Sequence, residues 1–182
     1  MKISRNTREQ LIIDYTPWFW GLFMVFFTLT FAGAGLALLA NGELIGLLFA
    51  GFGAGMGILA FGVFVRRVQV ILDRPNGILV IRRRTVSGYS EVVHQLAELE
   101  CAILEETAGS KGGRLYRPTL VLAGGMSAGR HPIVESYTNT GGPRRLAEAV
   151  NTWLPVDPRR VDILTRGGTP PPLTTRELEA RK

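Results

Sequence analysis

Two long apolar segments interrupt the pattern of charged residues near the N-terminus. No Asp, Glu, Lys, Arg or His occurs between Asp14 and Glu43, or between Glu43 and Arg66. A helix of about 20 mostly apolar residues crosses the roughly 30 Å hydrocarbon core of a bilayer. The pattern therefore predicts a two-helix transmembrane hairpin over 17–65, with helices at 17–40 and 44–65. A cleaved signal peptide is not favoured, because its apolar core would be shorter and a cleavage site would follow.

Basic residues flank this hairpin on one side. Three lie in the N-terminal segment 1–16, Arg66 and Arg67 follow the second helix, and the connecting loop carries only Glu43. Basic residues near membrane ends stay cytoplasmic. We therefore expect an integral inner-membrane protein, in a cytoplasmic or intracytoplasmic membrane, with both termini in the cytoplasm. Aromatic rings settle at the headgroup level, and the predicted interfacial anchors are Tyr15, Trp18 and Trp20.

Small residues are concentrated in both predicted helices. Gly51/Gly55 and Gly53/Gly57 form two G-x-x-x-G pairs, offset around the second helix. Such spacing lets helix backbones approach closely. Two interpretations stay open: the glycines pack the two helices together, or they leave a groove for a helix of another protein. The candidate packing or groove residues are Gly33, Gly51, Gly53, Gly55 and Gly57.

From residue 66 the pattern changes to short β-branched runs separated by Gly, Pro and Asn. These runs predict strands over 68–73, 78–84, 89–94, 98–105, 115–123 and 130–137. The strand over 98–105 competes with a helix over 96–106, because Ala, Leu and Glu favour helices. Apolar residues at helical spacing then predict an amphipathic helix over 143–154, which would close the mainly-β domain 66–154.

The segment 155–182 differs from the domain before it. It contains the run Pro170-Pro171-Pro172 and few large apolar side chains. Such a composition buries too little apolar surface to fold alone. We therefore expect a flexible tail over 155–182. Within it, Thr174-x-x-Glu177 has the spacing of a capping box for a final short helix over 175–181. That helix would be marginal alone and could order on a partner.

Composition and charge narrow the function. The chain is 46% hydrophobic with a net charge of +6, and the basic residues of its second half are mixed with acidic ones. They also lack interleaved aromatics for base stacking, which disfavours nucleic-acid binding. The single cysteine, Cys101, excludes a disulfide framework and a multi-cysteine metal site.

Few residues of the sequence are suited to act as catalytic groups. His94 and His131 are interpreted as structural or exposed, and Cys101 as a buried, inert thiol. Glu105 and Glu106 are adjacent in a predicted strand, so they point to opposite faces and are interpreted as solvated charges. We therefore expect a non-enzymatic protein with no catalytic residues, metal, cofactor or small-molecule substrate.

Arginines remain as candidate binding residues. The interpretation with fewest assumptions is that they obey the positive-inside rule and keep the strands soluble. Alternatively, they contact lipid headgroups, because a basic side chain near an anionic surface contributes roughly 1 kcal/mol. The candidate headgroup contacts are Arg66, Arg67, Arg74, Arg82 and Arg84.

The layout carries a resemblance. The motif Asp73-x-Pro75-x-Gly77 between the first two predicted strands, and the closing helix ending in Trp153-Leu154, resemble a pleckstrin-homology-like barrel. Bacterial membrane proteins join a two-helix hairpin to such a domain. The architecture is also similar to the photosystem I assembly protein family of cyanobacteria and chloroplasts. Where that family has a long basic-aromatic stretch, this chain has the sequence from Arg82 to Gly88.

The resemblance implies a role in membrane-complex assembly or support. Our main hypothesis is an integral membrane accessory or assembly factor for a larger complex, such as a photosynthetic or respiratory one. The alternative is a membrane-anchored, pleckstrin-homology-like domain that senses anionic lipid. The expected partners are membrane lipids and a membrane-protein complex, and not nucleic acid.

Overall fold

The computed structural model describes residues 1–86, 88–110, 112–124, 127–172 and 175–179. The chain divides into two compact units. The first, here called the sheet unit, contains Met1–Tyr15, Val68–Arg82 and Glu91–Lys182. The second, the helix unit, contains Thr16–Arg67 and Arg83–Ser90. The coarse layout predicted above is present: two apolar helices near the N-terminus precede antiparallel sheets and a C-terminal helix.

The N-terminal segment forms two strands, for which the sequence predicted no element. Strands β1 (Lys2–Asn6) and β2 (Gln10–Tyr15) pair antiparallel. Strand β2 then pairs with β3 (Arg67–Asp73), so that Tyr15 lies opposite Val68. The apolar helices are therefore an insertion between two neighbouring strands. Leu11 and Ile13 alternate inward from β2 and are fully buried, which makes this segment part of the core.

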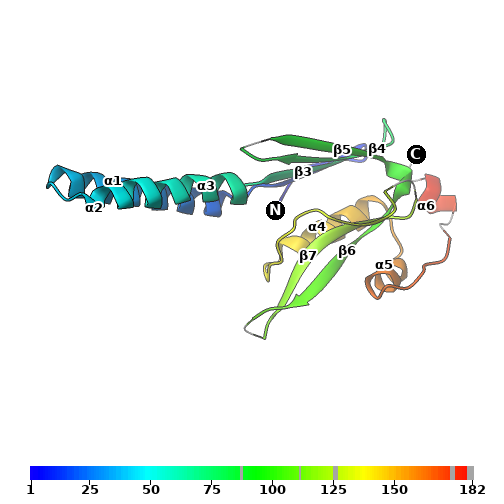
Figure 1. Ribbon diagram of the computed structural model, residues 1–182. Coiled ribbons are helices and arrows are strands. Elements are labelled where there is room, and N and C mark those ends of the chain that lie inside the picture. Colours follow the sequence, from blue (N-terminus) through cyan, green and yellow to red (C-terminus); the bar gives the residue numbers. More distant parts are fainter. Residues whose placement is uncertain (87, 111, 125–126, 173–174, 180–182) are drawn as a thin grey trace. The chain divides into compact units, whose positions relative to one another are not determined.

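Two antiparallel sheets make up the β structure (Figure 1). The first has the order β1-β2-β3-β4-β5, with β4 at Ile78–Arg84 and β5 at Tyr89–Gln95. A 3₁₀ turn, η2 (Leu96–Glu98), leads into the second sheet, β6-β7-β8. Its strands are β6 (Leu99–Ala108), β7 (Arg114–Leu122) and β8 (Gly129–Pro132). Strand is thus confirmed over helix for 98–105.

The last predicted strand, 130–137, is shorter than expected. Strand β8 ends at Pro132. Beyond it, the Ile133 N–H donates to the carbonyl oxygen of Pro118 on β7 at 3.0 Å, and Thr138 forms an isolated bridge with Tyr116. The chain therefore stays beside β7 past the proline without continuing as a regular strand.

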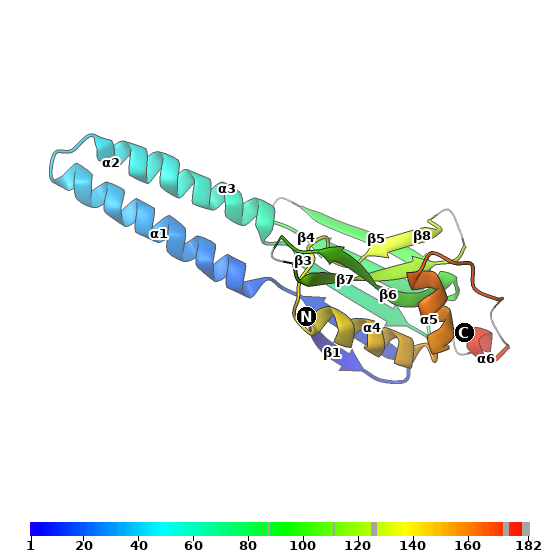
Figure 2. The same cartoon turned by 90° about the horizontal axis from the view of Figure 1, so that it is seen from below.

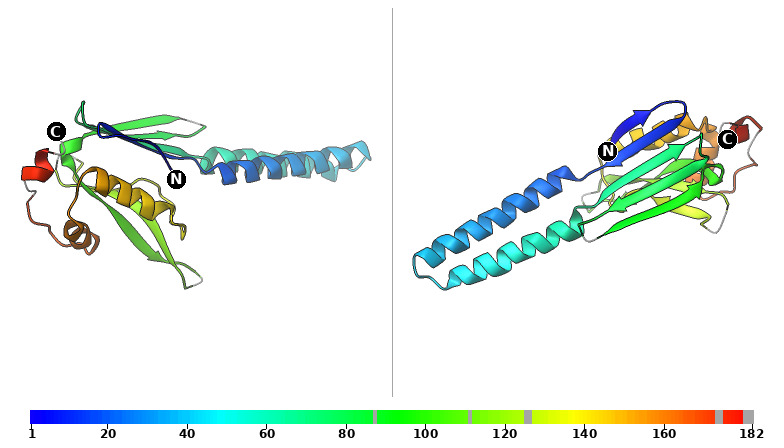
Figure 3. Two further views of the ribbon diagram at one scale, coloured as in Figure 1. Left: turned by 180° about the vertical axis from the view of Figure 1, so that it is seen from behind. Right: turned by 90° about the horizontal axis from the view of Figure 1, so that it is seen from above.

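One hydrophobic core joins both sheets to helix α4 (Gly142–Trp153), which lies alongside β6 and β7 (Figure 3). Leu146, Val150 and Trp153 point inward at helical spacing. Asn151 pairs with the backbone of Ala102 through two hydrogen bonds of 2.8 Å. Because β6 is the edge of its sheet, this amide covers part of that edge.

The described part of the segment 155–182 contains two helices, α5 (Pro158–Thr165) and α6 (Thr175–Glu179), while 173–174 and 180–182 lie outside the described residues. Helix α6 falls within the short helix offered over 175–181, and α5 was not expected. Arg160 of α5 is buried and donates to Glu100 of β6 at 2.5 Å and to the carbonyl oxygens of Pro171 and Pro172. A charged anchor holds this segment, so its low hydrophobicity was misleading.

The helix unit is a hairpin of two long helices (Figure 2). Helix α1 spans Trp18–Ala40. The returning helix consists of α2 (Ile45–Leu48), the π-helical turn η1 (Phe49–Gly53) and α3 (Ala54–Phe64). Both are long and apolar enough to cross a membrane, and they are only 6% and 17% buried in their most apolar windows. A core helix of a soluble protein would be mostly buried.

Candidate functional site

One face of the helix hairpin is closed by glycine contacts. A side chain added at Gly53 would collide with Phe31, and one at Gly57 would collide with Thr28. Gly35 and Gly46, which sequence reasoning left out of the candidate set, face each other across the hairpin and are equally crowded. These four glycines therefore pack the two helices together, as the first interpretation of the small residues expected.

A second set of glycines lies on open faces. Among the described residues, no atom outside the local backbone lies within 4 Å of a side chain built on Gly33, Gly51 or Gly55, or on Gly62. Residues 51, 55 and 62 are four and seven apart, so they follow one stripe of the returning helix. The structure thus separates the five candidate glycines into two groups, and Gly33, Gly51 and Gly55 remain free for a neighbour.

Aromatic side chains surround the start of α1. Trp18, Phe19, Trp20 and Phe23 form consecutive edge-to-face pairs with ring centroids 6.2–6.4 Å apart. Trp18 is 71% and Trp20 52% exposed. Tyr15 differs, because it packs against the core of the sheet unit. Two of the three predicted anchors are therefore open to the surroundings, and the third is part of the soluble fold.

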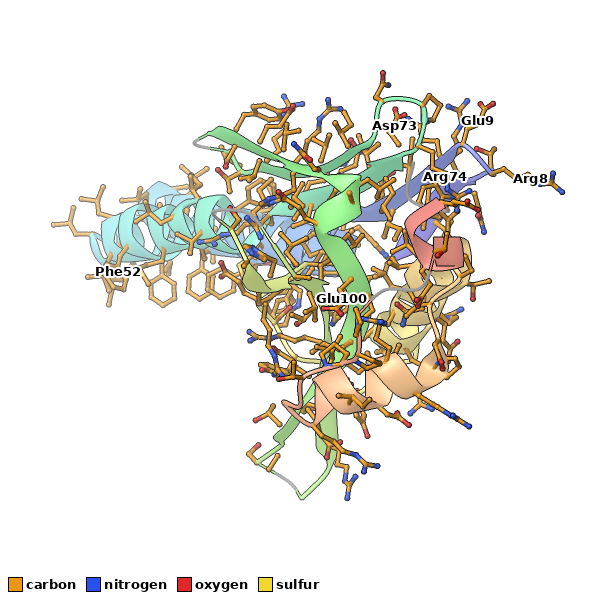
Figure 4. All side chains as sticks on the ribbon, turned by 90° about the vertical axis from the view of Figure 1, so that its right-hand side faces the viewer. Arg8, Glu9, Phe52, Asp73, Arg74 and Glu100 are labelled. Carbon is orange, nitrogen blue, oxygen red and sulfur yellow. The ribbon has the colours of Figure 1, made fainter. Side chains whose placement is uncertain are left out.

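Arg74 does not belong with the other candidate headgroup contacts. Its guanidinium lies 3.9 Å from the ring centroid of Trp153, donates to the carbonyl oxygen of Arg8 at 2.5 Å and also bonds the carbonyl of Trp153 (Figure 4). Burial lowers its pKa, although an arginine remains charged. Arg74 follows the last residue of β3, whereas Val68 lies near the start of the same strand, so the two are roughly 20 Å apart along it. Arg74 is therefore an internal clamp between the first hairpin and α4.

The remaining candidate arginines divide between the two units. Arg66 and Arg67 follow the returning helix and belong to the helix unit. Arg84 belongs to the same unit, as part of the β4–β5 turn region. Arg83, which was not among the predicted contacts, lies there too. Arg66 donates to the carbonyl oxygen of Val63 at 3.1 Å. Arg82 belongs to the sheet unit and forms an ion pair with Glu91 at 2.9 Å. Four arginines of the helix unit thus provide positive charge at the chain's exit from the apolar helices.

The two histidines lie together on the edge strands of different sheets. The rings of His94 on β5 and His131 on β8 are 5.3 Å apart between centroids. Burial lowers the pKa of His94, and the nearby His131 lowers it further, whereas Glu98 raises it. His131 Nε2 lies 2.6 Å from the carbonyl oxygen of Ser127, so this nitrogen carries a hydrogen. The two histidine rings therefore bridge the edge strands of the two sheets.

The other candidates for chemistry have structural partners. Cys101 is fully buried, as predicted. Glu105 and Glu106 point to opposite faces as expected, but Glu105 is not simply solvated: it accepts from Arg117 at 2.6 Å and lies 3.6 Å from Arg130. Among the described residues, no three His, Cys, Asp or Glu side chains gather where they could hold a metal ion.

Two polar clusters escaped sequence reasoning. The buried Arg160–Glu100 pair joins residues 60 apart, and Arg74 and Trp153 are 79 apart. Neither pair has a local spacing that predicts contact. A weak signal existed in the amphipathic helix, whose last residue, Trp153, carries a ring N–H that needs a partner when buried; it donates to the carbonyl oxygen of Thr7 at 2.7 Å.

Comparison with known proteins does not extend these observations. No protein-family model matches the chain, and no curated protein matches it. The features that bear on function are therefore the two helix faces, the aromatic residues at the start of α1 and the arginines of the helix unit.

Proposed function

We propose that this chain is a non-enzymatic, integral membrane accessory or assembly factor that supports a larger membrane-protein complex. The observation that carries the proposal is the apolar exterior of the helix hairpin. A water-exposed hairpin with this surface would expose far more contiguous apolar area than soluble proteins tolerate. Lipid and the helices of a partner are the surroundings in which such a surface is stable.

The chemistry around the hairpin supports a membrane location. Helix α1 has 23 residues, or about 34 Å at 1.5 Å per residue, which matches a bilayer core. Exposed Trp18 and Trp20 are suited to the headgroup level. Pairing of Tyr15 with Val68 brings both ends of the hairpin together, so both termini belong on one side. The arginines of the helix unit favour the cytoplasmic side.

The open glycine stripe supports lateral docking to a partner helix. Gly53 and Gly57 already pack within the hairpin, whereas a side chain built on Gly51 or Gly55 would meet no other part of the described chain within 4 Å. Close helix packing in lipid depends on such small residues. The sheet unit, with its antiparallel sheets and closing helix, would then contact the soluble part of the same complex.

The glycine stripe gives a sharp test of this function. Gly51→Leu with Gly55→Leu should abolish recovery of the partner complex from mild-detergent extracts, while the protein stays in the membrane. Phe52→Leu with Met56→Leu is the matched control, because both side chains are exposed on the same returning helix; Figure 4 labels Phe52. Unchanged recovery with the glycine variant would contradict lateral docking through this stripe.

The alternative function, sensing of anionic lipid, is favoured by one observation. Arg66, Arg67, Arg83 and Arg84 belong to the same unit as the apolar helices. An isolated domain from residue 66 onward would lack β1 and β2, so the test needs the full chain in nanodiscs. If Arg83→Glu with Arg84→Glu removes a stability difference between anionic and neutral nanodiscs, lipid sensing is supported. The absence of any such difference in the unmodified protein would exclude it.

A further inference from the structure

Strand β1 leaves an open edge beside helix α4. It is the outermost strand of the five-stranded sheet, and no described strand pairs with its other side (Figure 3). An edge strand presents alternate N–H and C=O groups that can accept another strand. The two edges of the other sheet differ, because Asn151 bonds part of β6 and His131 lies against His94 at β8. The other edge of the five-stranded sheet is β5, and the β1 edge is distinguished from it by the groove that lies beside β1.

A groove of about 670 Å³ lies between β1 and α4. On the helix side, Arg145, Glu148, Ala149 and Thr152 line it at spacings of three and four residues. These positions share one face of a helix, and the small side chains of Ala149 and Thr152 leave the space open. The volume lies within the range typical of binding sites for ligands.

The strand side of the groove depends on a bulge in β1. The register with β2 shifts between Ile3 and Arg5. A bulge of one extra residue reverses the alternation of side chains. Ile3 and Asn6, which would otherwise point to opposite faces, accordingly both line the groove. The strand thus supplies apolar and amide side chains next to its free backbone edge.

The charge of the groove selects its occupant. Arg8, Arg74 and Arg145 line it, against a single acidic residue, Glu148. Arg74 is fixed on the ring of Trp153. In the part of the chain that the structure describes, neither Arg8 nor Arg145 has an ion-pair partner. Two adaptable arginines therefore flank a fixed third one.

We infer that this groove binds an extended, acidic segment of a partner protein. The segment would add a strand to β1 through main-chain hydrogen bonds, with its acidic side chains paired to Arg8 and Arg145. Strand addition supplies affinity, and the arginines select for acidic side chains. This surface belongs to the sheet unit and does not depend on lateral docking of the helices.

The test uses the full chain in detergent micelles and a fluorescein-labelled peptide of alternating aspartate and valine. Fluorescence anisotropy should show saturable binding, and hydrogen exchange should slow at the amides of Lys2–Asn6. Methylation of alternate backbone nitrogens of the peptide should abolish binding, because it removes main-chain donors. A lysine–valine peptide should not bind.

Matched arginine variants separate groove binding from general attraction. Arg8→Glu with Arg145→Glu should weaken binding at least about tenfold. Arg144→Glu with Arg159→Glu, which changes the charge equally at exposed arginines outside the groove, should leave it unchanged. An equal loss of peptide binding in the two double variants, or the absence of saturable binding to the unmodified protein, would overturn the inference. Binding of glycerol phosphate instead of the peptide, with the same dependence on Arg8 and Arg145, would reassign the groove to lipid headgroups.

Discussion

At the residue scale, buried charges explain why the C-terminal segment folds. Arg160 is 4% exposed and Glu100 is 7% exposed, so neither charge is screened by water. Glu177 of α6 lies 3.6 Å from Arg160. Removing one partner of such a pair leaves an uncompensated charge in a medium of low polarity. Arg160 therefore holds β6, the proline segment and α6 together.

We predict that Arg160→Met destabilises the sheet unit by about 3–5 kcal/mol, because Glu100 loses its buried partner. Cys101 gives a direct measurement: it is the only cysteine and is fully buried, so its rate of labelling by a maleimide in urea reports opening of this unit. Arg160→Met with Glu100→Met should recover much of the loss. A labelling rate unchanged by Arg160→Met would contradict the role given to this pair.

The histidine pair predicts a pH dependence at the same scale. Burial and His131 hold the pKa of His94 below its ordinary value near 6.5. The folded state therefore binds fewer protons than the unfolded chain as the pH falls. The contribution of His94 to stability is complete above about pH 6.5 and is lost as the pH falls through the lower folded-state pKa.

We accordingly expect the sheet unit to unfold at a lower temperature at pH 5.5 than at pH 7.5. Labelling of Cys101, carried out for all samples after return to the same pH, measures the unfolding. His94→Gln should reduce this difference, because glutamine does not titrate. His131→Gln should reduce it less, since burial, the larger cause, would remain. An equal pH response in His94→Gln and the unmodified protein would show that other groups control it.

At the element scale, most helices and strands could be predicted, because hydrophobic periodicity is local. The two apolar helices and the strands before and after Asp73 follow directly from charge-free or β-branched runs. Strands β1 and β2 were missed because Leu11 and Ile13 alternate over only a few residues and gain their burial from β3, more than 50 residues away. Helix α5 was missed because its anchor is an arginine.

The glycines of the hairpin show the same limit. Four-residue spacing identified both G-x-x-x-G pairs. Only the packed structure separates Gly53 and Gly57, where an added side chain would collide with α1, from Gly51 and Gly55, where it would meet open space. Residue spacing alone does not say which face of a helix its neighbour covers. The sequence could therefore suggest a groove, but it could not divide the candidate glycines into those that pack within the hairpin and those that stay open.

We predict that Gly53→Ala destabilises the hairpin by about 1–3 kcal/mol, because the new methyl group overpacks against Phe31. Gly51→Ala, at an open position of the same helix, is the matched control and should be neutral or slightly stabilising. Far-UV circular dichroism during heating in detergent measures both. Equal effects of the two substitutions would argue against the assigned packing face.

At the scale of the whole molecule, the sheet unit and the apolar helices are interleaved in sequence. The helix hairpin is inserted between β2 and β3, which pair through six registered residues. The sheet unit therefore cannot be separated by cutting after the helices. It also follows that the pairing of β2 with β3 holds both ends of the hairpin beside each other.

This interleaving predicts that deletion of residues 1–15 unfolds the sheet unit. The deletion would expose the edge of β3, remove Leu11 and Ile13 from the core and leave the Trp153 ring N–H without Thr7. Leu11→Ala alone should cost about 2–5 kcal/mol. Protection of Cys101 from maleimide measures both changes. A deletion variant with fully protected Cys101 would contradict the role of the N-terminal hairpin.

Orientation in the membrane is a further prediction for the whole chain. In a Cys101→Ala background, Asn41→Cys should react with a membrane-impermeant maleimide added outside intact cells, because the short loop would face outward. Lys2→Cys should react only after the membrane is opened. Labelling of Lys2→Cys from outside would reverse the proposed orientation, and labelling of neither position even after opening would indicate that both are covered.

The most direct measurement of the proposed function is the state of the tagged full chain after extraction from its native membrane in mild detergent. Size separation followed by mass spectrometry should find it in a reproducible complex, with other membrane proteins in fixed ratio. Gly51→Leu with Gly55→Leu should release it from that complex, and Phe52→Leu with Met56→Leu should not. A purely monomeric product in every detergent that preserves other membrane complexes would contradict an accessory or assembly role.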